Sequence, residues 1–116
     1  MIDLREEVQA ALRDLEARAL QLYGQSMRGL VLFGSHARGD AGPDSDLDVA
    51  IVLDGEWQRA EEMLRWGAAR RSIEEATGVL LDLAFLRPAE WEGQTAGAEP
   101  EIYSTIREEG RFIARA

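Results

Sequence analysis

Two short apolar runs flank a fixed polar pattern near the middle of the chain, and this arrangement limits the folds open to it. Residues 29–33 (GLVLF) lead into Gly34 and Ser35. After ten intervening residues come Asp46 and Asp48 as an Asp-x-Asp pair, and a second run, VAIVL, fills residues 49–53. Short apolar runs bounded by glycine and polar residues are typical of buried strands. The pattern predicts a strand ending at Gly34, a helical turn beginning at Ser35, a polar loop and a second strand.

The polar residues of this pattern are suited to binding metal and phosphate. Successive side chains of a strand point to opposite faces, so Asp46 and Asp48 would share one face about 6.5 to 7 Å apart. Gly34 and Ser35, at a strand-to-helix junction, would expose N–H groups and a hydroxyl to phosphate oxygens. Mg²⁺ favours carboxylates combined with substrate phosphates. The combination indicates nucleotide chemistry, although residues 39–45 taken alone could be an ordinary surface turn.

Asp82 is a third candidate metal ligand. It is the only charged residue in the apolar run 79–86 (VLLDLAFL), which we expect to be an interior strand. A charge there is costly unless it is paired or metal-bound. With Asp46 and Asp48 nearby, three acids would repel one another without a cation. The alternative is an aspartate on an edge strand that faces solvent.

The remaining patterns predict helices on either side of these strands. A first helix should span about residues 3–23 and end at Gly24, and a second about residues 56–77, ending at Gly78. Their expected apolar stripes are Leu4, Val8, Ala11, Leu15 and Leu22 in the first, and Ala60, Met63, Leu64 and Gly67 in the second. Trp57 and Trp66 lie off the second stripe, so we expect them at the surface.

After Pro88 we expect a helical turn and loop, then a helix beginning at residues 99–100 and ending at Gly110. In this helix Ile102 and Ile106 share a face. Residues 111–114 would form a last short strand. The order of elements predicts an α+β fold, with α/β-type layers, in which a small mixed β-sheet is flanked by helices.

Composition narrows the function classes. At 116 residues, the chain is expected to be one domain over residues 1–116. It has no cysteine, no long apolar run and no signal-like start, so we expect no disulfide, no membrane segment and a cytoplasmic location. The net charge of -9 disfavours a nucleic-acid partner. All 13 basic residues are arginines, which excludes a lysine nucleophile or phosphate clamp.

The run GSHARGDAGPDSDLD resembles the signature of the nucleotidyltransferases of the DNA polymerase β superfamily, most closely the minimal nucleotidyltransferase (MNT) group. The resemblance covers about residues 28–86. It implies a nucleoside triphosphate donor, most plausibly ATP, and Mg²⁺, with two ions expected. It also implies that Asp46 and Asp48 coordinate the metal that grips the triphosphate. Asp82 would complete the second metal site, and Gly34 and Ser35 would hold the β and γ phosphates.

Three other residues of the motif have less defined roles. Arg38 could add a contact to phosphate, or form a salt bridge to Asp40 or Asp44. His36, the only histidine, is expected at the surface or at a helix N-terminus rather than in catalysis. Ser45 is expected to cap the loop or to hydrogen-bond its own backbone ahead of the strand.

The resemblance also bears on the acceptor. MNT proteins are often encoded beside HEPN proteins as toxin–antitoxin pairs, in which the MNT protein is the antitoxin and adenylylates a tyrosine of the HEPN toxin. The expected function is therefore transfer of NMP to a hydroxyl of a HEPN-type partner, in a hetero- or homo-oligomer. Two alternatives stay open: a non-catalytic binding antitoxin, and a small-molecule nucleotidyltransferase resembling those that modify aminoglycosides.

Overall fold

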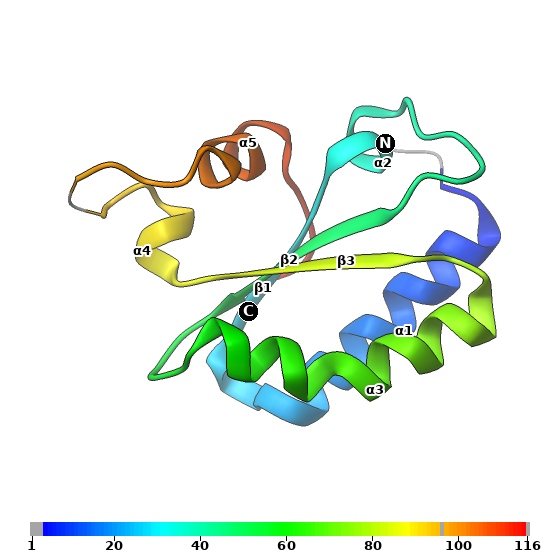
Figure 1. Ribbon diagram of the computed structural model, residues 1–116, viewed down its shortest axis with the longest axis horizontal. Helices are drawn as coiled ribbons and strands as arrows, with labels where there is room; N and C mark the ends of the chain where they lie inside the picture. The colour runs from blue at the N-terminus through cyan, green and yellow to red at the C-terminus, as the bar shows by residue number, and fades with distance from the viewer. Residues whose placement is uncertain (1–3, 96, 116) are drawn as a thin grey trace.

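The computed structural model describes residues 4–95 and 97–115 and contains a four-stranded mixed sheet (Figure 1). The strands are β1 (Met27–Phe33), β2 (Leu47–Leu53), β3 (Leu81–Leu86) and β4 (Arg111–Arg115). Their order across the sheet is β3-β2-β1-β4. β1 is antiparallel to both β2 and β4, whereas β2 and β3 run parallel.

Helices cover both faces of this sheet. They are α1 (Glu6–Tyr23), η1 (Gly24–Ser26), α2 (Gly34–Arg38), α3 (Arg59–Thr77), α4 (Pro88–Trp91) and α5 (Glu101–Glu109). α1 and α3 lie on one face and α4 and α5 on the other, while α2 lies at one end of the strands (Figure 1). This confirms the predicted α+β class with a mixed sheet flanked by helices.

The alternation of side chains along β2 shows how the two faces are filled. Leu47, Val49 and Ile51 belong to the larger core beneath α1 and α3. Ala50 and Val52 belong to a smaller core on the face covered by α4 and α5. Asp48 therefore lies on the α4/α5 face.

The first helix follows its predicted stripe over most of its length. Val8, Ala11 and Leu15 are fully buried, and Gly24 ends the helix with a positive φ of 56°. Leu22 departs from the prediction, because its side chain is 45% exposed. The last turn of α1 packs instead through Tyr23, whose ring lies 6.4 Å from that of Trp66.

The predicted stripe of the second helix is wrong. Met63 and Leu64 are exposed, whereas Trp66 and Ile73 are buried. Trp66 sets the rotation of α3, because its indole N–H donates to the Tyr23 hydroxyl at 2.8 Å. The same hydroxyl donates to the buried Glu62 at 2.6 Å, and a buried indole or phenol needs such a partner.

Trp57 is also buried rather than at the surface. Its indole N–H donates to the carbonyl oxygen of Leu53 at 2.8 Å, and its ring packs 6.2 Å from that of Phe85. The guanidinium of Arg87 lies over the ring, 4.3 Å from its centre. The ring therefore fills the junction between the end of β2 and the start of α3.

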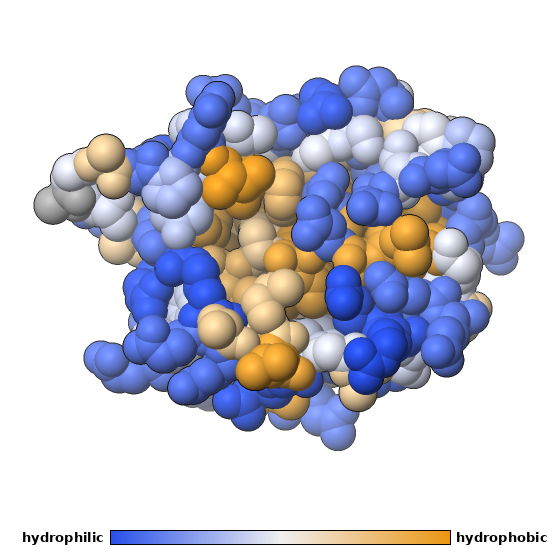
Figure 2. Space-filling view, viewed as in Figure 1, coloured by the Kyte–Doolittle hydropathy of each residue, from blue (hydrophilic) through white to orange (hydrophobic). Residues whose placement is uncertain are grey.

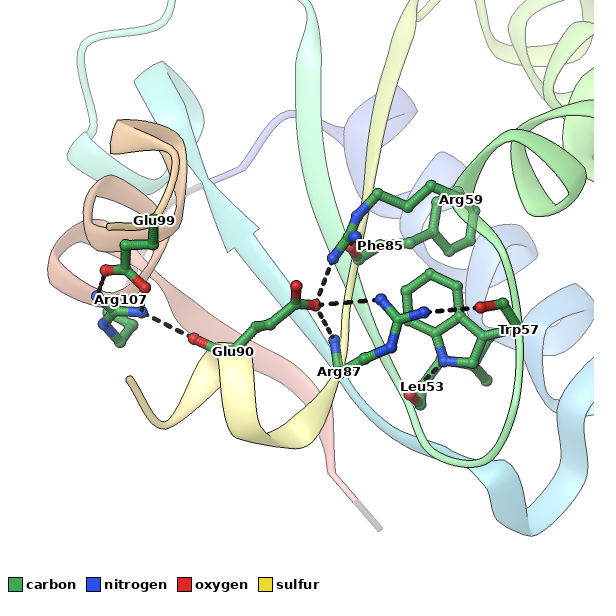
Figure 3. A network of polar contacts seen from close by, with 8 residues as sticks. All are labelled: Leu53, Trp57, Arg59, Phe85, Arg87, Glu90, Glu99 and Arg107. Atoms are coloured by element: carbon green, nitrogen blue, oxygen red, sulfur yellow. Dashed lines mark hydrogen bonds and ion pairs between the residues drawn. The ribbon is translucent and has the colours of Figure 1, made fainter. Parts of the chain in front are cut away.

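A polar network around buried Glu90 ties α4 to the neighbouring elements (Figure 3). Oε1 of Glu90 accepts the backbone N–H of Arg87 at 2.7 Å and forms an ion pair with Arg59. The backbone carbonyl of Glu90 accepts a hydrogen bond from Arg107 of α5 at 2.7 Å, and Arg107 also pairs with Glu99. The network attaches α5 to α4.

None of the helices within residues 4–95 and 97–115 combines the length and apolarity that crossing a membrane requires.

Candidate active site

The predicted strand-to-helix junction forms at Gly34, where β1 ends and α2 begins. Gly34 has a φ of +73°, a conformation that favours glycine. A Cβ atom at this position would lie 2.1 Å from Oδ2 of Asp48, because Asp48 is paired with Phe33 across β1 and β2. The absence of a side chain at Gly34 therefore lets the carboxylate of Asp48 lie against the Gly-Ser junction.

Asp48 and Asp82 lie side by side across the parallel pair of β2 and β3. Burial raises the pKa of Asp48 to about 6, and the charge of Asp82, a hydrogen bond between the two carboxyl groups and the charge of Asp46 add to this rise. The charge of Arg38 partly offsets it. Two adjacent carboxylates repel each other, and a bound cation would relieve that repulsion.

The expected placement of Asp82 needs correction. β3 is an edge strand rather than an interior one, and the side chain of Asp82 is exposed. The run is largely apolar because its side chains pack on both faces of the sheet. Leu81, Leu83 and Phe85 face α1 and α3, whereas Leu86 packs on the other face. Solvent therefore reaches Asp82. Its charge is not buried, so it does not by itself require a bound metal.

Asp46 lies one residue before β2 and is exposed. Its negative charge contributes to the raised pKa of Asp48. Across the described part of the chain, no three His, Cys, Asp or Glu side chains are already gathered as a ligand set for a metal ion. The donor set nevertheless fits Mg²⁺, which is commonly held by one or two carboxylates, with substrate phosphate and water filling its other positions.

His36 is buried within α2 rather than at the surface. Its Nδ1 lies 3.2 Å from the backbone carbonyl oxygen of Asp46, so Nδ1 carries the proton and donates it. Burial lowers the pKa of His36, and this favours the neutral ring. His36 thus links α2 to the segment that carries Asp46. Ser45, as predicted, caps the loop, since its hydroxyl accepts the N–H of Gly42 at 2.9 Å.

Glu109 is a residue of the site that the sequence pattern does not reveal. It is the last residue of α5, and its Oε2 accepts the backbone N–H of Gly34 at 3.1 Å. Its Oε1 accepts a hydrogen bond from Arg38 at 2.9 Å, and Arg38 also pairs with Asp40 as one alternative anticipated. Glu109 follows Gly34 by 75 positions, so no local spacing signals this contact.

The sequence of this chain is similar to those of two known enzymes. Two relatives called aminoglycoside nucleotidyltransferase (4'), from Staphylococcus aureus and a Bacillus species, are each 28% identical to this chain over 94 residues. The match covers 78% of this chain, but the chain spans only 36% of the length of each relative.

A solved structure from Sulfolobus solfataricus, described provisionally as a nucleotidyltransferase, has a similar fold. It superposes with a TM-score of 0.52 at 16% sequence identity, and the match covers 99% of this chain and 92% of the other. At that identity the likeness concerns the fold alone. The sequence profile described as "Nucleotidyltransferase domain" matches residues 12–113. Because this match spans most of the chain, the chain belongs to the nucleotidyltransferase domain family.

Proposed function

We propose that this protein is a metal-dependent nucleotidyltransferase that transfers NMP, from ATP as the preferred donor, to a hydroxyl group. The observation that carries the proposal is the adjacency of Asp48 and Asp82 beside the Gly34 junction. Family membership supports the same reaction class. The expected arrangement is one domain over residues 1–116 that acts in the cytoplasm.

Each residue of the site has a role in this proposal. Asp46, Asp48 and Asp82 would hold the Mg²⁺ ions, with two ions expected. When bound, such ions neutralise charge on the attacking and leaving oxygens of an in-line displacement. The N–H of Gly34, the hydroxyl of Ser35 and the guanidinium of Arg38 bind phosphate oxygens. A carboxylate oxygen of Asp82, open to solvent, would accept the proton of the acceptor hydroxyl. The hydroxyl oxygen then bonds to the α-phosphorus as the bond to the bridging oxygen breaks and pyrophosphate leaves.

We propose a protein acceptor, namely a tyrosine of a HEPN-type toxin for which this chain is the antitoxin. The motif supports this through its resemblance to MNT antitoxins. An apolar groove of about 280 Å³ follows β3, the strand that carries Asp82, and is lined by Met63, Phe85, Ile102 and Tyr103 among others. Figure 2 shows hydrophobic side chains gathered on this face, over β3 between α3 and α5. Exposed apolar patches of this kind are typical of protein-contact surfaces.

A small-molecule acceptor is a second candidate, favoured by the two relatives named as aminoglycoside nucleotidyltransferases. Aminoglycosides are polycations. The net charge of -9 and the exposed carboxylates of Asp46 and Asp82 suit such a ligand.

Transfer of α-labelled ATP tests both candidates. The parent, the Asp46→Asn/Asp48→Asn double variant and the control Asp54→Asn are each incubated with Mg²⁺ and a lysate of the native host, or with aminoglycosides. Asp54 is exposed and directly follows the last residue of β2, at the opposite end of the strand from Asp46, where it pairs with Arg28. We expect the parent and the control to label one discrete protein on tyrosine, and the double variant to label nothing.

Each other outcome identifies an alternative. Labelled aminoglycoside and no labelled protein would establish the small-molecule candidate. No label with any divalent metal, together with a stable complex with a toxin that both the parent and the double variant neutralise, would establish a non-catalytic binding antitoxin.

A further inference from the structure

The carboxylate of Glu109 accepts hydrogen bonds from Gly34 and Arg38, two of the groups that bind phosphate in the proposed function. One oxygen accepts the N–H of Gly34 at 3.1 Å, and the other accepts a guanidinium N–H of Arg38 at 2.9 Å. The side chain of Glu109 is 23% exposed, so it is held at the junction rather than projecting into water. An amide N–H and a guanidinium group can donate hydrogen bonds to either a carboxylate or a phosphate.

These donors cannot serve both anions at once. The single N–H of Gly34 is already taken by Glu109, and a phosphate group there would meet the negative charge of that carboxylate. Asp48 adds a second negative charge against the same glycine. We propose that Glu109 takes the place of the nucleotide phosphate in the nucleotide-free protein and sets nucleotide affinity, since it must leave before the phosphate binds. This inference rests on the proposed function.

The attachment of α5 indicates how Glu109 leaves. Arg107, two residues earlier, donates to the backbone carbonyl of Glu90 and pairs with Glu99 (Figure 3). Ile106 of the same helix is fully buried. The helix therefore stays in place, and the flexible side chain of Glu109 leaves by rotation about its own bonds.

The chain offers a matched control for this contact. Glu108 precedes Glu109 on α5 and is exposed. Glu109→Gln and Glu108→Gln thus remove the same charge one position apart, and only the first weakens the contact with Gly34 and Arg38. If Glu109 occupies the donors about nine-tenths of the time, it lowers apparent nucleotide affinity about tenfold.

The experiment measures the Kd of ATP by calorimetry, with Mg²⁺ at fixed ionic strength, for the parent, Glu109→Gln, Glu109→Ala and Glu108→Gln. Circular dichroism checks that each variant is folded. We expect both Glu109 variants to bind ATP several-fold to about tenfold more tightly than the parent. We expect Glu108→Gln to stay within about twofold of the parent, as an exposed charge would.

The results separate this inference from the proposed function. If the parent binds ATP but Glu109→Gln binds no more tightly than Glu108→Gln, the competition inference is overturned and the proposed function stands. Weaker binding by both Glu109 variants would also overturn it, because Glu109 would then position Arg38 for the nucleotide. If none of the four proteins binds ATP with Mg²⁺, the proposed function itself fails, and the inference fails with it.

Discussion

At the scale of single residues, Gly34 and Gly39 form a natural comparison. Both have a positive φ, of 73° and 84°, but a Cβ would meet Asp48 at Gly34 and nothing within 4 Å at Gly39. We predict that Gly39→Ala costs about 1 kcal/mol through its backbone alone. Gly34→Ala should cost about 1–3 kcal/mol more and lower transfer about a hundredfold, because the Asp48 carboxylate is displaced.

Urea denaturation and transfer assays measure the two effects. Equal stability and equal activity of Gly34→Ala and Gly39→Ala would show that the carboxylate of Asp48 does not lie against Gly34.

The raised pKa of Asp48 predicts how stability depends on pH. Its pKa is about 6 in the folded protein against an ordinary 3.8, so between these values the folded state binds a proton that the unfolded chain has released. The stability of the metal-free protein should therefore fall as the pH rises from about 4 to 6. Asp48→Asn removes this charge, so it should stabilise the metal-free protein at pH 8 and have little effect at pH 4.5.

We expect the gain at pH 8 to be about 1 kcal/mol, since the half-exposed carboxylate is screened by solvent. Denaturation in EDTA at the two pH values measures it. Asp54→Asn is the control, because the hydrogen bond from Arg28 lowers the pKa of Asp54 and its removal should not stabilise the protein. A gain of equal size at both pH values would contradict the assigned cause.

At the scale of elements, Glu90 holds α4 and the polar network that attaches α5 to it. It accepts the N–H of Arg87 and pairs with Arg59. Glu90→Ala would leave this amide and this guanidinium without their acceptor, at a cost of about 2 kcal/mol. Glu92→Ala, at an exposed position just after α4, should cost less than about 0.5 kcal/mol. Chemical denaturation compares them, and equal losses would mean that the network does not stabilise the junction.

The elements also show where sequence patterns were informative. The strand and helix boundaries around Gly24, Gly34 and Gly78 follow from local chemistry, because glycine there adopts a positive φ that ends or begins an element. The buried face of α3 does not follow from its apolar residues. It is set by hydrogen bonds between Trp66, Tyr23 and Glu62 that join two helices distant in sequence.

At the scale of the whole molecule, the acidic charge predicts that metal and nucleotide bind together. A protein of net charge -9 repels a triphosphate unless cations accompany it. Mg²⁺ and ATP together at 100 times Kd should stabilise the protein by about 2.7 kcal/mol, which raises Tm by about 10 °C or more. ATP in EDTA should give a much smaller rise.

Thermal denaturation of the parent, Asp54→Asn and the Asp46→Asn/Asp48→Asn variant measures this stabilisation. We expect the double variant alone to lose it. An equal rise with ATP in EDTA would contradict a metal-assisted site.

Local sequence patterns were enough to predict the α+β class, the strand-to-helix junction at Gly34 and the candidate carboxylates, because these depend on short-range alternation, turn chemistry and spacing. The position of β3 at the sheet edge, the exposure of Asp82 and the hydrogen bond between Glu109 and Gly34 became known from the folded chain alone. Strand order, helix rotation and contacts across 75 residues depend on which surfaces pack together. No local pattern encodes that choice.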